Sequence, residues 1–495
     1  MVSREGFRFQ WKRVSGTLGT LLKNKMAAVG LILLFSFLFM ALGAPLLSPY
    51  LPTEQVSGVL AQPEWVMNFP DGYYLSKNIV VVNDPQFNSP SSIQSWAVTA
   101  LPATMSSLQL TYASGVVPTS NSRGSMQMNY TGTSPGLVRV SQTFQYPYRG
   151  PPKEFAASIA YRFSGATTAQ PIHIKLFIDA GPGRVFNLID ENETLSGKWL
   201  PPPSTSLDSV SDDVARALGT RGSGFTAPEL VFSARQAYSY GVEFTFYAAG
   251  QGVNVDNLQL TLFGTAWGLM GTDYAGADVF SQVVYGARIS LLVGLLSAGI
   301  GISLGLIVGL LAGFLGRLID EVLMRFTDMM LVIPGLPLLI VLVAVLGASI
   351  WNLIIVIGFL GWMGFARIVR SQVLTLRERP FVEAAKAAGA GPGRIIMRHI
   401  FPNIVSLTYV NLALTVPGAI LSESALAFLG LSDPTVNSWG HMFENVSISG
   451  ALARQPPPWW WVLPPGFSIA LVSLSFVLIG YALDEVFNPR LRKRR

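Results

Sequence analysis

Long runs of apolar residues lie near both ends of this chain, while its middle alternates apolar and polar positions. The first run covers residues 26–47 without a charged residue, and a helix needs about 20 residues to cross a bilayer. We reject a cleaved signal peptide here, because signal h-regions hold only about 7–15 apolar residues. Later runs lie at 289–315, 329–366, 404–431 and 462–483.

The run between Asp328 and Arg367 contains no charge and is too long for one span. Gly347, Ala348 and Ser349 lie in its middle, which predicts two helices joined by a tight outer turn. Pro334 and Pro337 are expected to kink the first of these helices. The pattern as a whole therefore predicts six transmembrane helices.

Residues 49–265 contain no spanning run and predict a separate domain. Their apolar residues recur at every second position, with turn-forming residues between the segments. Ile172, Ile174 and Leu176, for example, alternate with His173, Lys175 and Phe177, as expected for a strand with one buried and one partly wet face. The clearest predicted strands are 137–144, 156–163, 172–178, 242–247 and 258–263, and one helix is predicted at 207–218. We expect an inserted extracellular all-β domain of the sandwich or jelly-roll type.

Composition and charge agree with a membrane protein. Half of the 495 residues are hydrophobic and 13% are charged. Residues 50–285 hold 12 basic and 17 acidic side chains, a net charge of −5. The whole chain carries +6, so the other parts together carry +11. Since basic segments stay inside, the middle domain is expected outside and both termini in the cytoplasm. This uneven distribution argues against nucleic-acid binding, and the absence of cysteine excludes disulfides.

A short basic stretch between two apolar runs, residues 381–403, has the pattern of two small helices with a break. Residues 381–388 are rich in alanine, the Gly-Ala-Gly-Pro-Gly sequence at 389–393 interrupts them, and helical spacing resumes at 394. Pro402 predicts the next helix boundary. His399 alone is more often a structural histidine than a working group.

Several residues of this stretch resemble the EAA loop of permease subunits in binding-protein-dependent ABC importers, specifically the dipeptide/oligopeptide class. They are Glu383, Ala384, Ala385, Gly389, His399, Pro402 and Asn403. The resemblance implies the type I ABC importer permease fold and a coupling helix that sits in a cleft of an ATPase subunit. It also implies a second homologous permease, two ATP-binding subunits and an extracellular substrate-binding protein as partners.

Residues 267–292 resemble the segment that leads into the second membrane helix of that family, except that Ala277 and Gln282 replace arginines. Glu423 lies within a segment similar to the family's ILTEAALSFLGLG. An acid in a span is costly and is usually turned inward or paired. We consider a gate or pathway group and an interhelical hydrogen bond near the outer end, and favour the latter.

The expected division of the chain follows. It comprises a cytoplasmic amphipathic segment (1–25), a first transmembrane helix (26–48), the β domain (49–265), a re-entry segment (266–288), a five-helix core (289–485) and a basic cytoplasmic tail (486–495). The protein is expected in the plasma membrane.

The predicted function is that of a permease subunit of an ATP-driven importer that moves di- or oligopeptides. No GxxxxGK[ST] sequence occurs, so we expect ATP and Mg to be bound by the partner ATPases, no cofactor on this chain and no enzyme activity of its own. The alternatives are an importer of oligosaccharides, a membrane-anchored carbohydrate-binding receptor, because residues 253–262 resemble a strand of sugar-binding jelly-roll modules, and an ion channel.

Overall fold

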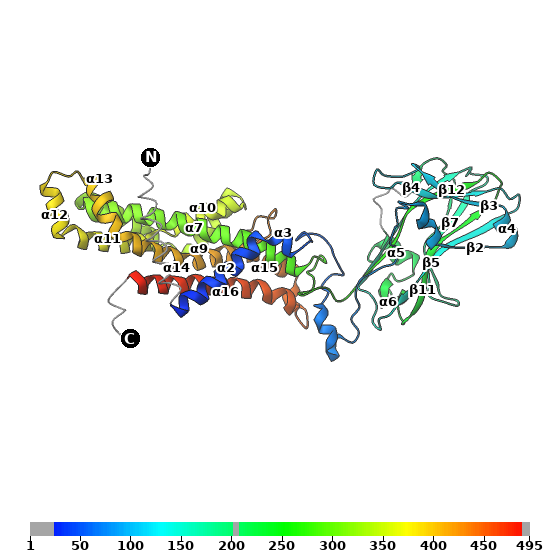
Figure 1. Ribbon diagram of the computed structural model, residues 1–495, viewed down its shortest axis with the longest axis horizontal. Helices are drawn as coiled ribbons and strands as arrows, with labels where there is room; N and C mark the ends of the chain where they lie inside the picture. The colour runs from blue at the N-terminus through cyan, green and yellow to red at the C-terminus, as the bar shows by residue number, and fades with distance from the viewer. Residues whose placement is uncertain (1–23, 201–206, 488–495) are drawn as a thin grey trace. The chain divides into compact units, whose positions relative to one another are not determined.

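The computed structural model describes residues 24–200 and 207–487. The amphipathic segment predicted at 1–25 and the tail predicted at 486–495 lie almost wholly outside the described residues. The chain divides into two compact units, Glu54–Asp278 and a unit made of Met1–Thr53 with Val279–Arg495. Strands gather in the first unit and long helices in the second (Figure 1), so the fold is a helical membrane domain with an inserted β domain, as predicted.

The β unit consists of two antiparallel sheets. One sheet has the order β10-β6-β12-β4-β3, with β1 paired to β12 and β9 to β6, and the other has the order β2-β5-β11-β7-β8. The strands of the first sheet are β1 (Ile79–Val80), β3 (Leu108–Ser114), β4 (Gly124–Tyr130), β6 (Glu154–Ser164), β9 (Trp199–Leu200), β10 (Leu207–Asp208) and β12 (Gly252–Phe263). Those of the second are β2 (Ala97–Ala100), β5 (Gly136–Tyr146), β7 (Ile172–Asp179), β8 (Val185–Glu193) and β11 (Gln236–Phe246).

Both sheets contribute to one hydrophobic core, which holds Val140 from β5, Ile159 from β6, Ile174 from β7 and Val255 from β12. The five predicted strands all occur as parts of longer strands, except that the predicted strand 242–247 extends one residue beyond the end of β11. The predicted alternation of buried and partly exposed residues in 172–178 was wrong at Phe177, which is buried. The Arg139 guanidinium lies 4.0 Å from the centroid of its ring and covers it.

The helix predicted at 207–218 is shorter than expected. Leu207 and Asp208 instead pair with β6 as β10. The Ser211 side chain accepts a hydrogen bond from the Val214 amide, so the helix α5 begins after this cap and covers Asp212–Ala217. Further short helices in the unit are α4 (Pro102–Ser106), α6 (Ala227–Val231), η1 (Glu64–Asn68), η2 (Pro70–Gly72) and η3 (Pro90–Ser95).

The limits of the β unit differ from the predicted 49 and 265. Residues 266–278 belong to it, because Gln55 bridges to Ala277 and Gln62 bridges to Ala266. The Thr272 hydroxyl reinforces this pairing by donating to the Gly58 carbonyl at 2.6 Å. The incoming and outgoing chain segments are therefore hydrogen-bonded to each other at the base of the β unit.

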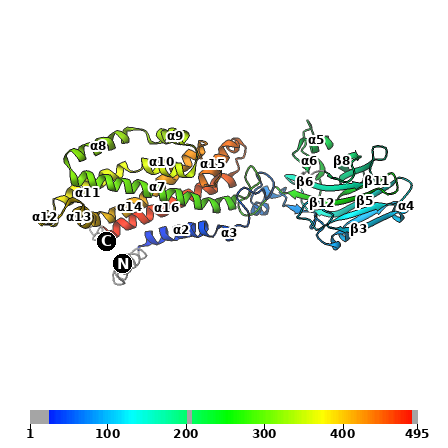
Figure 2. The same ribbon diagram turned by 90° about the horizontal axis from the view of Figure 1, so that it is seen from above.

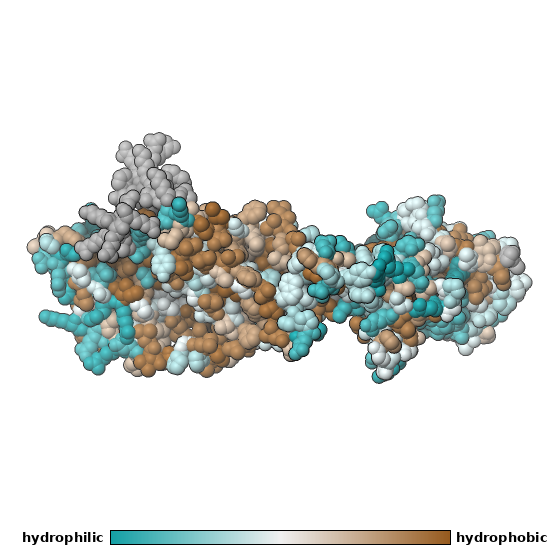
Figure 3. Space-filling view, turned by 90° about the horizontal axis from the view of Figure 1, so that it is seen from below, coloured by the Kyte–Doolittle hydropathy of each residue, from teal (hydrophilic) through white to brown (hydrophobic). Residues whose placement is uncertain are grey.

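The helical unit contains five helices in its described residues that are long and apolar enough to cross a membrane, or six spans if one bent pair counts as one. Apolar side chains cover its middle on the face shown in Figure 3. Its helices are α2 (Lys25–Leu42), α3 (Ala44–Leu47), α7 (Val279–Leu315), α8 (Arg317–Val332), α9 (Gly335–Leu346), α10 (Ile350–Leu360), α11 (Met363–Arg377), α12 (Pro380–Ala387), α13 (Pro392–Ile395), the π-helix η4 (Ile396–Ile400), α14 (Phe401–Phe428), α15 (Trp439–Ile448), η5 (Ala451–Ala453) and α16 (Trp459–Phe487).

Two predicted limits of the first spans were wrong. The first helix ends at Leu42 and a separate turn of helix follows from Ala44, because Pro45 can begin a helix but cannot continue one. The second begins at Val279 rather than 289, so part of the predicted re-entry segment is helical. The Arg288 guanidinium donates to the Ala41 and Leu42 carbonyls and joins these two helices.

The third predicted span is broken rather than kinked. α8 and α9 meet at an angle of 89°, and Figure 2 shows α9 beside α10. Ile333 is extended, as the residue before a proline tends to be, and Pro334 follows it as the N-cap of α9. Pro337 lies in the first turn of α9, where a helix tolerates a missing amide.

α7 and α11 pack closely through a line of glycines on α7. A Cβ on Gly305 would lie 2.6 Å from the Trp362 carbonyl oxygen, and one on Gly309 would lie 2.6 Å from the Ala366 carbonyl oxygen. Gly313 faces Val373 in the same way, at 2.7 Å. The Gly-rich pattern of α7 therefore permits the close helix approach that membrane bundles use.

Candidate coupling site and outer polar network

The predicted helix-break-helix lies between α11 and α14, at one end of the helical unit (Figure 1). α12 begins with Pro380 at its first position and is capped by Ala388. Gly389 follows with φ of +78°, a conformation that glycine adopts without strain. No atom lies within 4 Å of the place its Cβ would occupy, so the break faces open space.

Pro402 marks a boundary, as predicted, because it lies in the first turn of α14, which begins at Phe401 directly after the π-helix η4. The helix changes type there without ending, since the helical run continues from Pro392 to Phe428. The Phe401 amide donates to the Ile396 carbonyl, five residues earlier. A wider turn of this kind accommodates a residue that has no amide to donate.

Buried side chains fix the loop to the bundle. Val382 of α12, Ile395 of α13 and Ile400 of η4 belong to one buried cluster. The same cluster contains Phe314 of α7 and Val373 of α11. Val382 and Ile400 are fully buried. Because the loop is anchored to the ends of both α7 and α11, a force on α12 acts on these helices directly.

The predicted site residues divide into two groups. Glu383, Ala384 and Gly389 are exposed, and Ala385 is half-buried against the cluster. They form part of a coupling face, which we define as the exposed surface of residues 383–394. Small uncharged residues dominate this face, and Lys386 and Arg394 supply its cations.

The other predicted residues lie in η4 and in the first turn of α14. His399 is half-buried, and its ring centroid lies 6.5 Å from that of Phe381. Asn403 is exposed and its Nδ2 donates to the His399 carbonyl at 2.6 Å, while Pro402 is exposed beside it. Phe381 and Met397, whose apolar side chains are exposed, were not among the predicted residues. Their apolar character beside a polar loop is the signal that could have indicated them.

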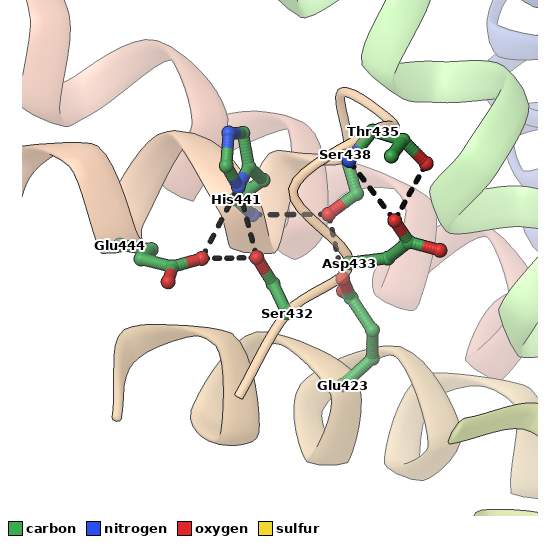
Figure 4. A network of polar contacts seen from close by, with 7 residues as sticks. All are labelled: Glu423, Ser432, Asp433, Thr435, Ser438, His441 and Glu444. Atoms are coloured by element: carbon green, nitrogen blue, oxygen red, sulfur yellow. Dashed lines mark hydrogen bonds and ion pairs between the residues drawn. The ribbon is translucent and has the colours of Figure 1, made fainter. Parts of the chain in front are cut away.

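Glu423 is 3% exposed and joins α14 to the start of α15 (Figure 4). The Ser438 hydroxyl donates to Glu423 Oε1 at 2.6 Å and accepts from the His441 amide at 3.0 Å, which makes Ser438 the N-cap of α15. The Ser424 hydroxyl donates to Glu423 Oε2 at 3.3 Å. This geometry fits the interhelical hydrogen bond that we favoured.

The same junction holds a second set of polar contacts (Figure 4). The Ser432 hydroxyl contacts Glu444 and lies 2.8 Å from His441 Nδ1, which is 3.1 Å from Glu444. Since the serine and the carboxylate meet the same ring nitrogen, the three groups do not form a nucleophilic triad.

Asp433 ties the junction to α10, because its Oδ2 accepts from the Ile350 amide at 3.0 Å. Partial burial raises the pKa of Asp433, but hydrogen bonds from Thr435 and Ile350 outweigh it and leave the pKa lowered.

A cavity of about 390 Å³ opens among α7, α9, α10 and α14. Its polar lining comes from Ser297, Thr415 and Ser422, and α9 supplies Gly335, Leu336 and Leu339. Glu423 is not among the lining residues. The helical spacing of Thr415, Gly418 and Ser422 along one face of α14 is the signal that could have found this site.

Two segments of the chain match models of known protein families. Residues 305–493 match the binding-protein-dependent transport system inner membrane component. Residues 10–63 match the N-terminal TM domain of oligopeptide transport permease C. The chain belongs to the dipeptide/oligopeptide class of ABC transporter permeases.

Individual relatives support the assignment of this permease to the dipeptide/oligopeptide class. A dipeptide transport system permease protein DppC of Alkalihalophilus pseudofirmus is 43% identical over 225 residues, which cover 45% of this chain and 72% of the relative. An oligopeptide transport system permease protein OppC of Haemophilus influenzae is 39% identical over 223 residues, covering 45% and 70%. A putative peptide permease of Brucella suis is 39% identical over 221 residues, covering 44% and 72%.

Among solved structures, a carbohydrate-binding module in complex with beta-1,4-galactotriose covers 37% of the permease and 97% of its own chain. The identity is 10% and the TM-score 0.25, so the ligand of that module says nothing about this chain.

Proposed function

We propose that this permease subunit imports di- and oligopeptides that an extracellular binding protein delivers, driven by ATP hydrolysis on separate ATPase subunits. The substrate class is supported by the relatives, which are named for dipeptide and oligopeptide transport. The coupling face is the single observation that carries the mechanism, since it combines an exposed set of mostly small side chains with a buried anchor.

The proposed assembly contains this chain, a second homologous permease subunit and two ATP-binding subunits in the plasma membrane. The coupling face lies in the cytoplasm together with both termini, and the β unit lies outside. The net charge of −5 over residues 50–285, against +11 for the remaining residues, supports this orientation.

In the proposed cycle, ATP closes the ATPase dimer and moves α12, which the ATPase grips through the coupling face. Val382 transmits the displacement to Phe314 and Val373, because all three share one packed cluster. Packed cores shift between discrete arrangements rather than deform continuously. α7 and α11 therefore tilt with α12, and α7 supplies Ser297 and Ala298 to the wall of the cavity that Thr415 and Ser422 line.

The test uses the complete importer reconstituted in proteoliposomes, with uptake of a labelled peptide and ATP hydrolysis measured together. Gly389→Trp places a large side chain on the coupling face at a positive φ, and Glu383→Ala removes its carboxylate. We expect each to reduce peptide uptake at least roughly tenfold, the loss expected when an interface contact worth about 1.4 kcal/mol or more is removed.

Glu321→Ala is the matched control, because it removes an exposed carboxylate on α8, outside the coupling face. It should leave uptake unchanged. Normal uptake together with normal substrate-stimulated hydrolysis in the Gly389→Trp and Glu383→Ala variants would refute the proposed role of the loop. Competition by unlabelled oligosaccharide, and not by peptide, would refute the substrate class.

A further inference from the structure

Two ion pairs join α8 to α11, the helix that leads into α12. Asp320 receives two hydrogen bonds from Arg370, Nε to Oδ1 at 2.5 Å and Nη2 to Oδ2 at 2.7 Å. Asp328 pairs with Arg367 through Nη2 and Oδ1. Both carboxylates come from α8 and both guanidinium groups from α11, so the two pairs act between the same two helices.

The geometry of the first pair sets it apart from an ordinary surface ion pair. Asp320 and Arg370 meet in a two-point contact, and their side chains are only 17% and 35% exposed. Two-point arginine–carboxylate contacts fix orientation as well as distance. By contrast, the Glu321–Arg325 pair lies within α8 and is 57% and 78% exposed, which makes it a local contact of little consequence.

Apart from the ion pairs, α8 meets the start of α11 through Met330, which packs against the buried cluster of Trp362, Met363 and Ala366. Thr327 is the one buried residue of α8, and Leu318, Val322, Met329 and Val332 all expose apolar side chains. Phe326 of α8 stacks on Trp362, which caps the start of α11, with ring centroids 6.2 Å apart. The ion pairs are therefore the main directional link between the two helices.

Both ends of this link reach functional parts of the helical unit. On one side, α11 is packed against the glycines of α7 and is followed after two residues by α12. On the other, α8 ends at the 89° break before α9, and α9 supplies Gly335, Leu336 and Leu339 to the cavity wall.

We propose that Asp320–Arg370 and Asp328–Arg367 form a clasp through which α8 moves together with the coupling helix. The clasp passes the displacement of α12 to the break at Pro334 and so to α9, which opens or narrows the cavity. The four side chains are positioning residues, since they do not line the cavity. This inference rests on the proposed function of the coupling face.

The first test is an exchange of charges in the reconstituted importer. Asp320→Arg and Arg370→Asp are each expected to reduce the ratio of peptide moved to ATP hydrolysed by at least about fivefold, the low end of typical coupling between sites. The double exchange should restore the ratio, because it rebuilds an ion pair at the same place. Glu321→Gln and Arg325→Gln serve as matched controls and should leave it unchanged.

The second test observes the clasp directly and leaves the coupling face unchanged. The chain contains no cysteine, so Val322→Cys on α8 and Glu378→Cys, between α11 and α12, can carry its only two spin labels. Both positions are exposed. We expect one distance distribution between them with and without ATP, because α8 and the segment that leads into α12 move as one body. Labels at Glu378→Cys and at the exposed Val345→Cys on α9 should change their separation with nucleotide.

A distance between positions 322 and 378 that shifts with ATP would overturn the clasp, as would single exchanges that leave the transport ratio unchanged. These results are separable from a failure of the proposed function. If the Gly389→Trp variant uncouples transport while the exchange variants do not, the coupling face stands and the clasp falls. If Gly389→Trp has no effect, the proposed function itself fails.

Discussion

The β unit contains a buried acid whose effect on stability can be worked out in sign and size. Asp256 lies on β12 beside a register irregularity and is fully buried. Its Oδ1 accepts from the Asn257 amide at 2.7 Å, while its Oδ2 has no hydrogen-bond partner among the described residues. Burial, aided by the nearby charge of Asp84, raises the pKa of Asp256 from 3.8 to about 6.

The sign follows from proton uptake. Between the unfolded pKa and the folded pKa, the native state holds the proton on Asp256 and the unfolded state has lost it. The contribution of Asp256 to the free energy of unfolding is therefore greatest below about pH 4 and falls as the pH rises towards about 6. A difference of roughly two pKa units corresponds to a loss of about 3 kcal/mol. Asp256→Asn mimics the neutral acid, keeps the acceptor for Asn257 and should remove this loss.

The assay is urea unfolding of a fragment covering residues 54–278, followed by far-UV circular dichroism at about pH 4 and about pH 7.5. We expect the fragment to fold, because its core is internal and its two ends are hydrogen-bonded to each other. The variant should exceed the parent by up to about 3 kcal/mol at the higher pH and match it at the lower one. Asp71→Asn, at an exposed position, is the control. Equal stability of parent and Asp256→Asn at both pH values would refute the reasoning.

Two further predictions concern the helical unit. Gly309→Ala should lower the free energy of unfolding in detergent by about 1–3 kcal/mol, because its Cβ would meet α11 at 2.6 Å. Gly299→Ala, with no atom within 4 Å of its Cβ, should not, and equal effects would contradict the packing argument. Glu423→Gln keeps an acceptor for Ser438 and should retain both stability and peptide uptake, whereas Glu423→Ala should cost about 1–3 kcal/mol. A Gln variant that is stable but inactive would instead make Glu423 a pathway group.

The pattern of apolar and polar residues predicted helices and strands correctly where one face of the segment is buried and the other is exposed. The alternation of residues 172–178 predicted β7, and the Ala-rich segment before Gly389 predicted α12. β4 was missed because Met126, Met128 and Tyr130 carry its buried face between polar residues. Methionine is common in helices as well, so this alternation is a weaker signal.

Contacts between distant residues were beyond the reach of pattern reasoning. Asp320 and Arg370 are separated by 50 positions and Glu423 and Ser438 by 15. Nothing in either local sequence indicates the partner. Pro402 shows the complementary case, since a proline predicts a boundary locally while the preceding π-helix lets the helix continue.

The sequence by itself determined the membrane class, the inserted β domain and the family, because hydrophobic period, run length and motif spacing are properties of neighbouring residues. Tertiary structure alone decided the 89° break between α8 and α9, the hydrogen bond from Ser438 to Glu423 at the α14–α15 junction and the ion pairs that join α8 to α11. The physical reason is that burial and pairing of a charge depend on which helices pack together, and that choice is made by the whole core.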